Sequence, residues 1–220
     1  MFNVCPGCGQ YSDDKQVITR DGGAFAVCEK CNYQHPFEML PLLVITGASG
    51  TGKTTVALRL PSIVSDCVCI ESDILWQEVF NKPEEDYKTY RNLWLRVAKN
   101  INQGNRPVVL IGSSTPGQFE KCAESRYFNK ICYLALVCDE AELVKRLKAR
   151  PSWRHSGSEE VLKNMVIFNQ WLIENAVKTR PTMSLLDTSN LTVDATVAKT
   201  KSWIERSLGA LSKHSVPGST

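Results

Sequence analysis

One segment, Gly47–Thr55, carries residue types that bind phosphate groups. It reads Gly-Ala-Ser-Gly-Thr-Gly-Lys-Thr-Thr and matches the pattern G-x-x-x-x-G-K-[ST]. Glycines allow backbone N–H groups to wrap a row of phosphates. We expect Lys53 to reach the β- and γ-phosphates of a nucleotide and the Thr54 hydroxyl to ligate magnesium. The residues expected to hold the nucleotide are Gly47, Ala48, Ser49, Gly50, Thr51, Gly52, Lys53, Thr54 and Thr55.

Four cysteines near the N-terminus form two pairs. Two residues separate Cys5 from Cys8 and Cys28 from Cys31, and 19 residues lie between the pairs. Two thiolates on each of two tight turns are typical of a tetrahedral zinc site, whereas cysteines that merely pack need no such spacing. Residues 1–40 resemble a zinc ribbon, a module that folds only around its metal. We therefore predict a structural Zn²⁺ held by all four thiolates.

Composition and charge limit the classes of partner. The net charge is +3, from 26 basic and 23 acidic residues, so the chain as a whole lacks the field of a nucleic-acid-binding protein. Residues 1–40 hold three basic and five acidic side chains, and zinc thiolates would make this part more acidic. An acidic ribbon binds phosphate backbones poorly, which favours a structural role or contact with a protein partner over nucleic acid.

No targeting or membrane segment is expected from the sequence. The apolar stretches end well short of the roughly 18 residues that a membrane span needs. The first residues, 1–6, show neither a charged leader nor an apolar signal core. These features predict a cytoplasmic protein without a membrane partner.

Short apolar runs alternate with helical patterns after residue 40. The run Leu42–Thr46 leads directly into Gly47–Thr55 and is continuous, as expected of a parallel strand buried on both faces. Helical periodicity follows at 87–101, 161–172 and 193–211. The pattern predicts an α/β fold with a five-stranded parallel sheet flanked by helices over residues 41–211, and a flexible tail at 212–220. The other four predicted strands are Cys67–Ile70, Pro107–Ile111, Ile131–Cys138 and Met183–Leu186.

A carboxylate follows the second predicted strand. Strands of such sheets line the ligand crevice with their carboxyl ends, which places Asp73 and, less directly, Glu71 near the nucleotide. The alternative is that Asp73 caps a helix containing Leu75, Val79 and Phe80.

A second acidic pair, Asp139-Glu140, leaves a choice between two classes of enzyme. Placed after an apolar strand, the pair matches an ATPase in which Asp139 assists magnesium and Glu140 activates water. In the competing interpretation Asp139 is the N-cap of a helix over Glu140–Arg150. A guanine-specific switch is disfavoured, because Asn129-Lys130-Ile131-Cys132 lacks the aspartate of N-K-x-D.

The arginines of this helix carry a family resemblance. Arg146 and Arg150 lie four residues apart, and Arg154 follows Pro151. Together with the phosphate loop, they resemble the lid entry of P-loop kinases of the nucleoside- and nucleotide-kinase-like group, which includes adenylate, gluconate and adenylylsulfate kinases and chloramphenicol phosphotransferase. The resemblance implies that Arg146 contacts adenine and phosphate, and that Arg150 and Arg154 close over the γ-phosphate. The alternative is a solvated basic helix face.

The resemblance also implies roles for other residues. An aspartate at the place of Asp73 deprotonates or orients the attacking hydroxyl in several such kinases. Asp187 and Thr188 match a loop that approaches adenine. For the phosphoryl acceptor, Trp76 and Trp153 are candidate pocket residues, and a phosphorylated acceptor would need cations. The candidate cations are Arg91, Arg96 and Arg126.

The sequence thus predicts a phosphotransferase that uses ATP and Mg²⁺. It would move the γ-phosphoryl group to a small-molecule acceptor: a nucleoside, a nucleotide or another hydroxyl compound. The alternative is a P-loop ATPase coupled through the zinc ribbon to a protein or nucleic-acid partner.

Overall fold

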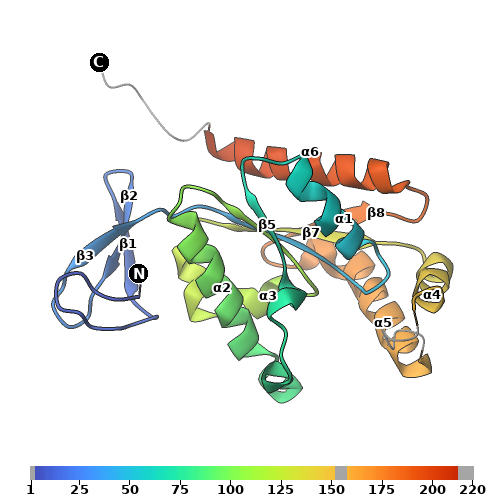
Figure 1. Cartoon of the computed structure of the whole chain (residues 1–220), viewed down its shortest axis with the longest axis horizontal. Coiled ribbons are helices and arrows are strands. Elements are labelled where there is room, and N and C mark those ends of the chain that lie inside the picture. The colour runs from blue at the N-terminus through green and yellow to red at the C-terminus, as the bar shows by residue number, and fades with distance from the viewer. Residues whose placement is uncertain (1–2, 152–157, 213–220) are drawn as a thin grey trace.

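The chain forms two separate β-sheets. The computed structural model describes residues 3–151 and 158–212. Trp153, Arg154 and all but the first residue of the predicted tail lie outside these described residues. A three-stranded sheet lies at the N-terminal end of the molecule, and a five-stranded sheet with helices on both faces forms the rest (Figure 1). The predicted α/β class with a five-stranded parallel sheet is confirmed.

The five-stranded sheet is wholly parallel and has the order β5-β6-β4-β7-β8. β4 is central, so the phosphate loop that follows it leaves the middle of the sheet at its carboxyl edge. Every strand begins and ends within one residue of its predicted run. The strands are β4 (Leu42–Gly47), β5 (Val68–Glu71), β6 (Val108–Ile111), β7 (Ile131–Val137) and β8 (Met183–Asp187).

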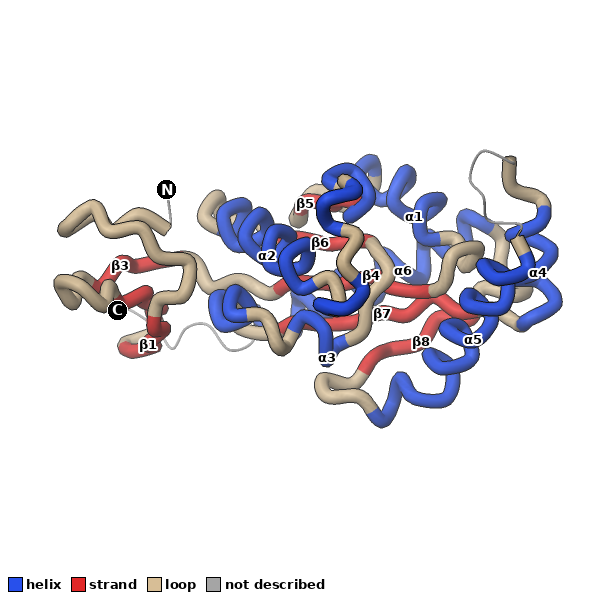
Figure 2. The backbone as a smooth tube through the Cα atoms, turned by 90° about the horizontal axis from the view of Figure 1, so that it is seen from below, coloured by secondary structure: helices blue, strands red, loops and turns tan. Residues whose placement is uncertain are grey.

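Two helical layers bury the two faces of this sheet. On one face, which Leu43 and Ile45 of β4 meet, lie α1 (Lys53–Arg59) and α6 (Val193–Ser212), drawn above the sheet in Figure 1. On the other face lie α2 (Lys88–Asn102), α3 (Pro116–Phe119) and α5 (Glu159–Asn175). The tube in Figure 2 shows α4 (Glu140–Lys148) beside α5, at the end of the molecule opposite the three-stranded sheet.

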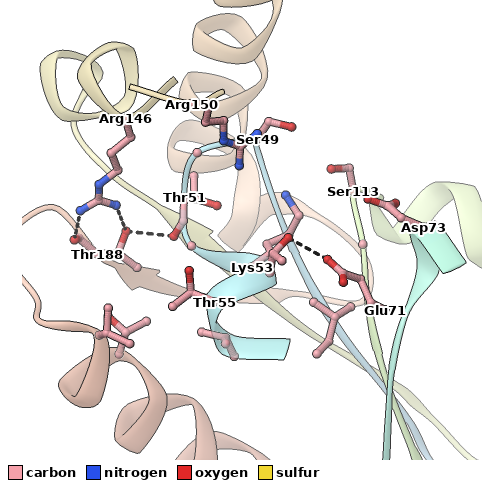
Figure 3. A pocket seen from close by; sticks show the side chains of 18 of the residues that line it. Ser49, Thr51, Lys53, Thr55, Glu71, Asp73, Ser113, Arg146, Arg150 and Thr188 are labelled. Atoms are coloured by element: carbon pink, nitrogen blue, oxygen red, sulfur yellow. Dashed lines mark hydrogen bonds between the residues drawn. The ribbon is translucent and has the colours of Figure 1, made fainter. Parts of the chain in front are cut away.

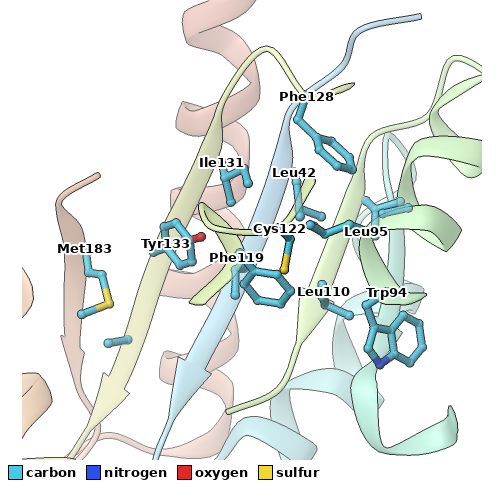
Figure 4. Close-up of a cluster of buried hydrophobic side chains, with 14 of the residues drawn as sticks. Leu42, Trp94, Leu95, Leu110, Phe119, Cys122, Phe128, Ile131, Tyr133 and Met183 are labelled. Atoms are coloured by element: carbon cyan, nitrogen blue, oxygen red, sulfur yellow. The ribbon is translucent and has the colours of Figure 1, made fainter. Parts of the chain in front are cut away.

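The larger hydrophobic core lies between β4 and α2. Leu42 packs with Trp94 and Leu95 of α2, and Phe119 and Tyr133 close the cluster (Figure 4). Trp94 is part of the predicted three- and four-residue periodicity of this helix, so its apolar stripe is confirmed as a buried face.

The segment between β5 and α2 differs from the prediction. Instead of one helix through Leu75, Val79 and Phe80, it forms two short 3-10 turns separated by extended residues at Trp76 and Gln77. Asp73 lies inside the first turn, so its predicted role as a helix N-cap is wrong. The indole of Trp76 packs against aromatic rings of the neighbouring segment rather than continuing a helix. The 3-10 helices are Leu60–Ser62, Ser72–Leu75, Glu78–Phe80, Pro83–Glu85, Ala123–Tyr127 and Ala176–Lys178.

The three-stranded sheet is antiparallel, with the order β1-β2-β3. It consists of β1 (Gln16–Arg20), β2 (Gly23–Val27) and β3 (Gln34–Phe37). β1 and β2 form a hairpin whose two-residue turn is Asp21-Gly22. Both turn residues have positive φ, 52° and 76°, which is the backbone that a tight two-residue hairpin requires.

This N-terminal module, residues 3–40, is joined to the helical layer by a mixed contact. Tyr127 packs edge-to-face on Phe37, with ring centroids 5.8 Å apart, and its hydroxyl accepts a 2.8 Å hydrogen bond from the backbone N–H of Lys15. Arg96 of α2 pairs with Asp13, and Arg126 pairs with Asp14 at 2.6 Å. The acidic residues of the module therefore meet arginines of the larger sheet's helical layer.

That contact corrects two expectations. Arg96 and Arg126 were expected near the acceptor, whereas both are engaged by the N-terminal module.

In the described part of the chain, no helix combines the length and apolar character that a membrane crossing requires.

Candidate functional site

The phosphate loop has a backbone that only glycine accommodates at its key positions. Gly47, Gly50 and Gly52 have φ of 150°, 96° and 103°. A Cβ on Gly47 would lie 2.4 Å from the carbonyl oxygen of Leu136, and one on Gly50 would lie 2.9 Å from a methyl of Leu143. The loop is therefore pressed against β7 and α4, and its backbone lines the adjoining cavity.

The ammonium group of Lys53 is held over this loop. Its Nζ donates to the carbonyl oxygens of Gly47 and Ala48, at 2.6 and 3.0 Å. Burial lowers the pKa of Lys53 to about 8, while the nearby carboxylates of Asp73 and Glu71 favour the charged form. A buried cation of this kind gains energy from an anionic ligand in the same cavity.

A cavity of about 390 Å³ opens beside the loop, and we call it the loop cavity. Residues far apart in the sequence converge on it: Lys53 lies between Glu71 and Asp73 on one side and Arg146 and Thr188 on the other (Figure 3). Of the predicted nucleotide-binding residues, the structure brings these to its lining: Ser49, Gly50, Thr51, Gly52, Lys53, Thr54, Thr55, Arg146 and Thr188.

The Thr54 hydroxyl and Glu71 form a site whose chemistry suits magnesium. Thr54 Oγ1 donates to Glu71 Oε1 at 2.7 Å, and Asp73 lines the same cavity. A hydroxyl and carboxylates are hard oxygen ligands of the type that Mg²⁺ binds alongside water and phosphate oxygens. Sequence reasoning ranked Glu71 below Asp73, but Glu71 is the residue that contacts Thr54.

Arg146 ties three segments together at the far side of the loop cavity. Its guanidinium donates to Glu142 Oε1 at 2.8 Å, to Thr188 Oγ1 at 3.1 Å and to the Thr188 carbonyl at 2.9 Å. Thr188 Oγ1 also donates to the backbone of Thr51, at 3.2 Å. Arg146 thus has a fixed orientation beside the phosphate loop, and Arg150, one helical turn on, lines the same cavity.

Asp187 has a different place from the one predicted. Its carboxylate accepts hydrogen bonds from the backbone N–H and the hydroxyl of Ser189, at 2.9 and 2.5 Å. Among the described residues it is Thr188, not Asp187, that contributes to the lining of the loop cavity. Asp187 therefore shapes the turn after β8. Leu191, Val193 and Thr196, which sequence reasoning missed, continue the lining from this turn into α6.

The acidic pair Asp139-Glu140 lies at the start of α4. Asp139 accepts a 2.8 Å hydrogen bond from the backbone N–H of Glu142, which makes it the N-cap and lowers the pKa of its carboxyl. Glu140 is exposed in the first helical turn. Neither is among the described residues that line the loop cavity. The interpretation of Asp139 as the N-cap of this helix is confirmed.

A second cavity, of about 290 Å³, adjoins the first, and we call it the aromatic cavity. Asp73, Gly112 and Ser113 line both cavities, so the two meet at the carboxyl ends of β5 and β6. Sequence reasoning proposed Trp76 and Arg91 for the acceptor, and both line this cavity. It missed Tyr87, Tyr90 and Trp94, because their periodicity predicts only a packed helix face. The further lining residues include Ser72, Asn81, Tyr87, Tyr90, Arg91, Trp94, Ser114 and Phe119.

The four N-terminal cysteines converge as predicted. Their Sγ atoms all lie within 4.8 Å of one another, with Cys5 and Cys31 3.6 Å apart and Cys8 and Cys28 3.7 Å apart. Tetrahedral zinc with Zn–S bonds of about 2.3 Å requires sulfurs about 3.8 Å apart, so these residues fit the ion. A backbone hydrogen bond at Cys31 lowers the pKa of the Cys28 thiol to about 6, which favours the thiolate that zinc binds.

Solved structures with a similar fold include small-molecule kinases. A sugar kinase from Janibacter sp. HTCC2649 has a TM-score of 0.54 at 14% identity, over 76% of this chain and 95% of that one. A gluconokinase from Sinorhizobium meliloti 1021 has a TM-score of 0.53 at 17% identity, over 82% and 99% of the two chains. A shikimate kinase from Acinetobacter baumannii has a TM-score of 0.50 at 16% identity, over 79% and 96%.

A search of the curated proteins finds no match to the sequence. The sequence pattern of the AAA domain family matches residues 43–163, which is more than half of the chain and includes the phosphate loop, β5 to β7 and α4. The chain therefore has the fold of the P-loop kinases and belongs to the AAA domain family.

Proposed function

We propose that the protein is a phosphotransferase that moves the γ-phosphoryl group of ATP to a hydroxyl group of a small molecule. The observation that carries the proposal is the position of Asp73, which lines both the loop cavity and the aromatic cavity. A nucleotide in the first cavity and an acceptor in the second would meet at this carboxylate. An enzyme that only hydrolyses ATP needs no second cavity at that point.

The proposed reaction follows from the groups around this junction. The acceptor oxygen attacks the γ-phosphorus, the bond from that phosphorus to the bridging oxygen of ADP breaks, and the hydroxyl proton passes to Asp73 and then to solvent. Lys53, Arg146 and Arg150 bind and orient the phosphates. Thr54 and Glu71 would hold a magnesium ion, which when bound would supply charge neutralisation on the phosphate oxygens. The products are ADP, a phosphate monoester and a proton.

The N-terminal module has a supporting role in this proposal. Residues 1–40 form a zinc-binding unit docked on α2, and residues 41–211 form the phosphotransferase domain. The docking contact uses two of the module's five acidic residues, Asp13 and Asp14. Arg154, which the resemblance adds to the lid, lies outside the described residues.

Substitution Asp73→Asn tests the proposal directly. It removes the proton acceptor while keeping the shape of the side chain, so acceptor-dependent ADP release should fall by about 100-fold or more, with ATP affinity little changed. The assay is ADP release by zinc-loaded protein with Mg²⁺ and ATP, with and without pooled nucleosides, sugars and aromatic alcohols.

Glu140→Gln is the matched control, because Glu140 is an acidic residue of the alternative ATPase and is exposed at the start of α4. It should leave acceptor-dependent release unchanged. Steady hydrolysis without acceptor that is lost in Glu140→Gln and kept in Asp73→Asn would replace the phosphotransferase with the coupled ATPase.

A further inference from the structure

The aromatic cavity has the character of a binding site for a flat ring. Trp76 and Tyr90 meet edge-to-face, with ring centroids 5.2 Å apart at 88°, and Tyr90 meets Trp94 in the same way, at 6.4 Å and 84°. These three side chains form a continuous aromatic wall from the mouth of the cavity to its buried end, where Trp94 is 2% exposed. Aromatic rings on a ligand gain contact energy against such a wall.

One apolar side chain of the cavity is partly open to solvent. Trp76 lines the cavity and is 43% exposed. An apolar ring on the acceptor would remove part of the surface of Trp76 from water.

The charge in this cavity does not suit an anionic acceptor. Among its described lining residues, Asp73 is the one carboxylic acid and Arg91 the one basic side chain. The guanidinium of Arg91 is paired with Asp86 at 3.2 Å and lies over the ring of Tyr87, 5.6 Å from its centroid. Because this guanidinium is already paired, the described lining of the aromatic cavity offers no further cation to a carboxylate or phosphate on the acceptor. Arg96 and Arg126 are held by the N-terminal module.

One buried polar group points to a hydrogen bond with the ligand. Ser114 is 5% exposed and lines the aromatic cavity, and its hydroxyl has no hydrogen-bond partner among the described residues. Its backbone N–H and carbonyl are both bonded to the Thr46 hydroxyl, at 2.9 and 2.6 Å, so the residue is fixed in place. Buried hydroxyls are nearly always partnered, and a polar atom of a ligand in this cavity would complete the set.

We infer that the phosphoryl acceptor is an uncharged alcohol that carries a flat, unsaturated ring. The ring lies against Trp76 and Tyr90, a polar ring atom or substituent bonds to the Ser114 hydroxyl, and the reacting hydroxyl faces Asp73. The inference rests on the proposed phosphotransferase activity and names the class of its acceptor. ATP and the alcohol give ADP, the phosphate ester of the alcohol and a proton.

The test compares three acceptor classes on the full-length, zinc-loaded protein. The ring alcohols are uridine, pyridoxine and 2-phenylethanol, the anionic acceptors are gluconate and shikimate, and the polyol is glucose. Acceptor-dependent ADP release should show kcat/KM at least about tenfold higher for a ring alcohol than for any member of the other classes, the size expected for one aromatic contact.

Two variants locate the ring. Trp76→Ala should raise the KM for the ring alcohol about tenfold and leave the KM for ATP unchanged. Trp171→Ala is the matched control, since Trp171 on α5 is 39% exposed and lies outside the lining of the cavity in the described residues. Ser114→Ala should raise the same KM by roughly three- to tenfold through one lost hydrogen bond.

The outcomes separate the two levels of the proposal. Equal or faster turnover of glucose, gluconate or shikimate would overturn the acceptor class and keep the phosphotransferase. An unchanged KM in Trp76→Ala would overturn the placement of the ring and with it the class. ATP hydrolysis that no acceptor of any class stimulates would overturn both.

Discussion

The two cavities that meet at Asp73 are built in different ways. Eight consecutive residues, 49–56, supply much of the loop cavity, and the backbone of the phosphate loop is fixed by glycines and by contact with β7 and α4. The aromatic cavity draws its lining from short segments spread between Val44 and Phe119. A phosphate-binding loop can therefore be formed by one short stretch of sequence, because every nucleotide offers the same phosphate oxygens. An acceptor site depends instead on how elements far apart in the sequence pack together.

Removal of the Lys53 charge should reduce turnover more than any other substitution described below. This loss should come from the loop cavity and not from acceptor binding. Lys53→Met removes the charge that stabilises the transferring phosphoryl group, so kcat should fall by about 100- to 1000-fold. Acceptor binding, measured by quenching of tryptophan fluorescence, should stay within twofold. Lys148→Met, at an exposed lysine of α4, is the control and should keep wild-type turnover. Equal losses of ATP turnover and acceptor binding would show that the two cavities do not bind their ligands separately.

Arg146 tests the far side of the loop cavity with a smaller expected effect. Arg146→Gln loses the bonds to Thr188 and to Glu142, and the KM for ATP should rise about tenfold, as expected for one charge-assisted contact. The KM for the acceptor should not change. Arg206→Gln, at an exposed arginine of α6, is the control. A rise in the acceptor KM alone would assign Arg146 to the wrong cavity.

Loss of zinc tests whether the N-terminal module supports the structure of the aromatic cavity. The N-terminal module docks on Arg96 of α2, the helix that carries Tyr90 and Trp94 of the aromatic wall. Cys31→Ser should release zinc and lower the unfolding free energy by about 1–2 kcal/mol, a fall of roughly 2–8 °C in melting temperature. The acceptor KM should rise about threefold, a change of under 1 kcal/mol, while the KM for ATP stays the same.

Zinc content and calorimetry check this expectation, with Cys132→Ser in β7 as the control that keeps the metal. An acceptor KM that is unaffected by loss of zinc would show that the module stabilises the fold without bracing the aromatic cavity. A matching rise in the KM for ATP would show that loss of zinc disturbs both cavities alike.

The features that the sequence could predict are those that neighbouring residues form, as in the phosphate loop. The strands and the phosphate loop were predictable because apolar runs and glycine spacing are local signals. The role of Asp139 was left open between an N-cap and a catalytic carboxylate, and the structure has the N-cap. The four-cysteine cluster was predictable for the same reason, since its spacing is local to each turn.

The rest depended on contacts that no local pattern contains. Periodicity identified the apolar stripe of α2 but not the second use of Tyr90 and Trp94 as a cavity wall. Arg96 and Arg126 were expected at the acceptor, yet they pair with Asp13 and Asp14, which lie more than eighty residues earlier in the chain. Charge alone predicts that an arginine will find an anion, not which anion the fold brings to it.

In the proposed reaction a phosphoryl group passes from the loop cavity to an acceptor in the aromatic cavity. This transfer can be followed at the γ-phosphorus by ³¹P NMR while zinc-loaded protein turns over ATP with Mg²⁺ and a ring alcohol. We expect the signal to appear as a phosphate monoester in step with ADP, and we expect Asp73→Asn to suppress it. A γ-phosphorus signal that appears only as inorganic phosphate, at the same rate with and without the alcohol, would contradict the proposed transfer.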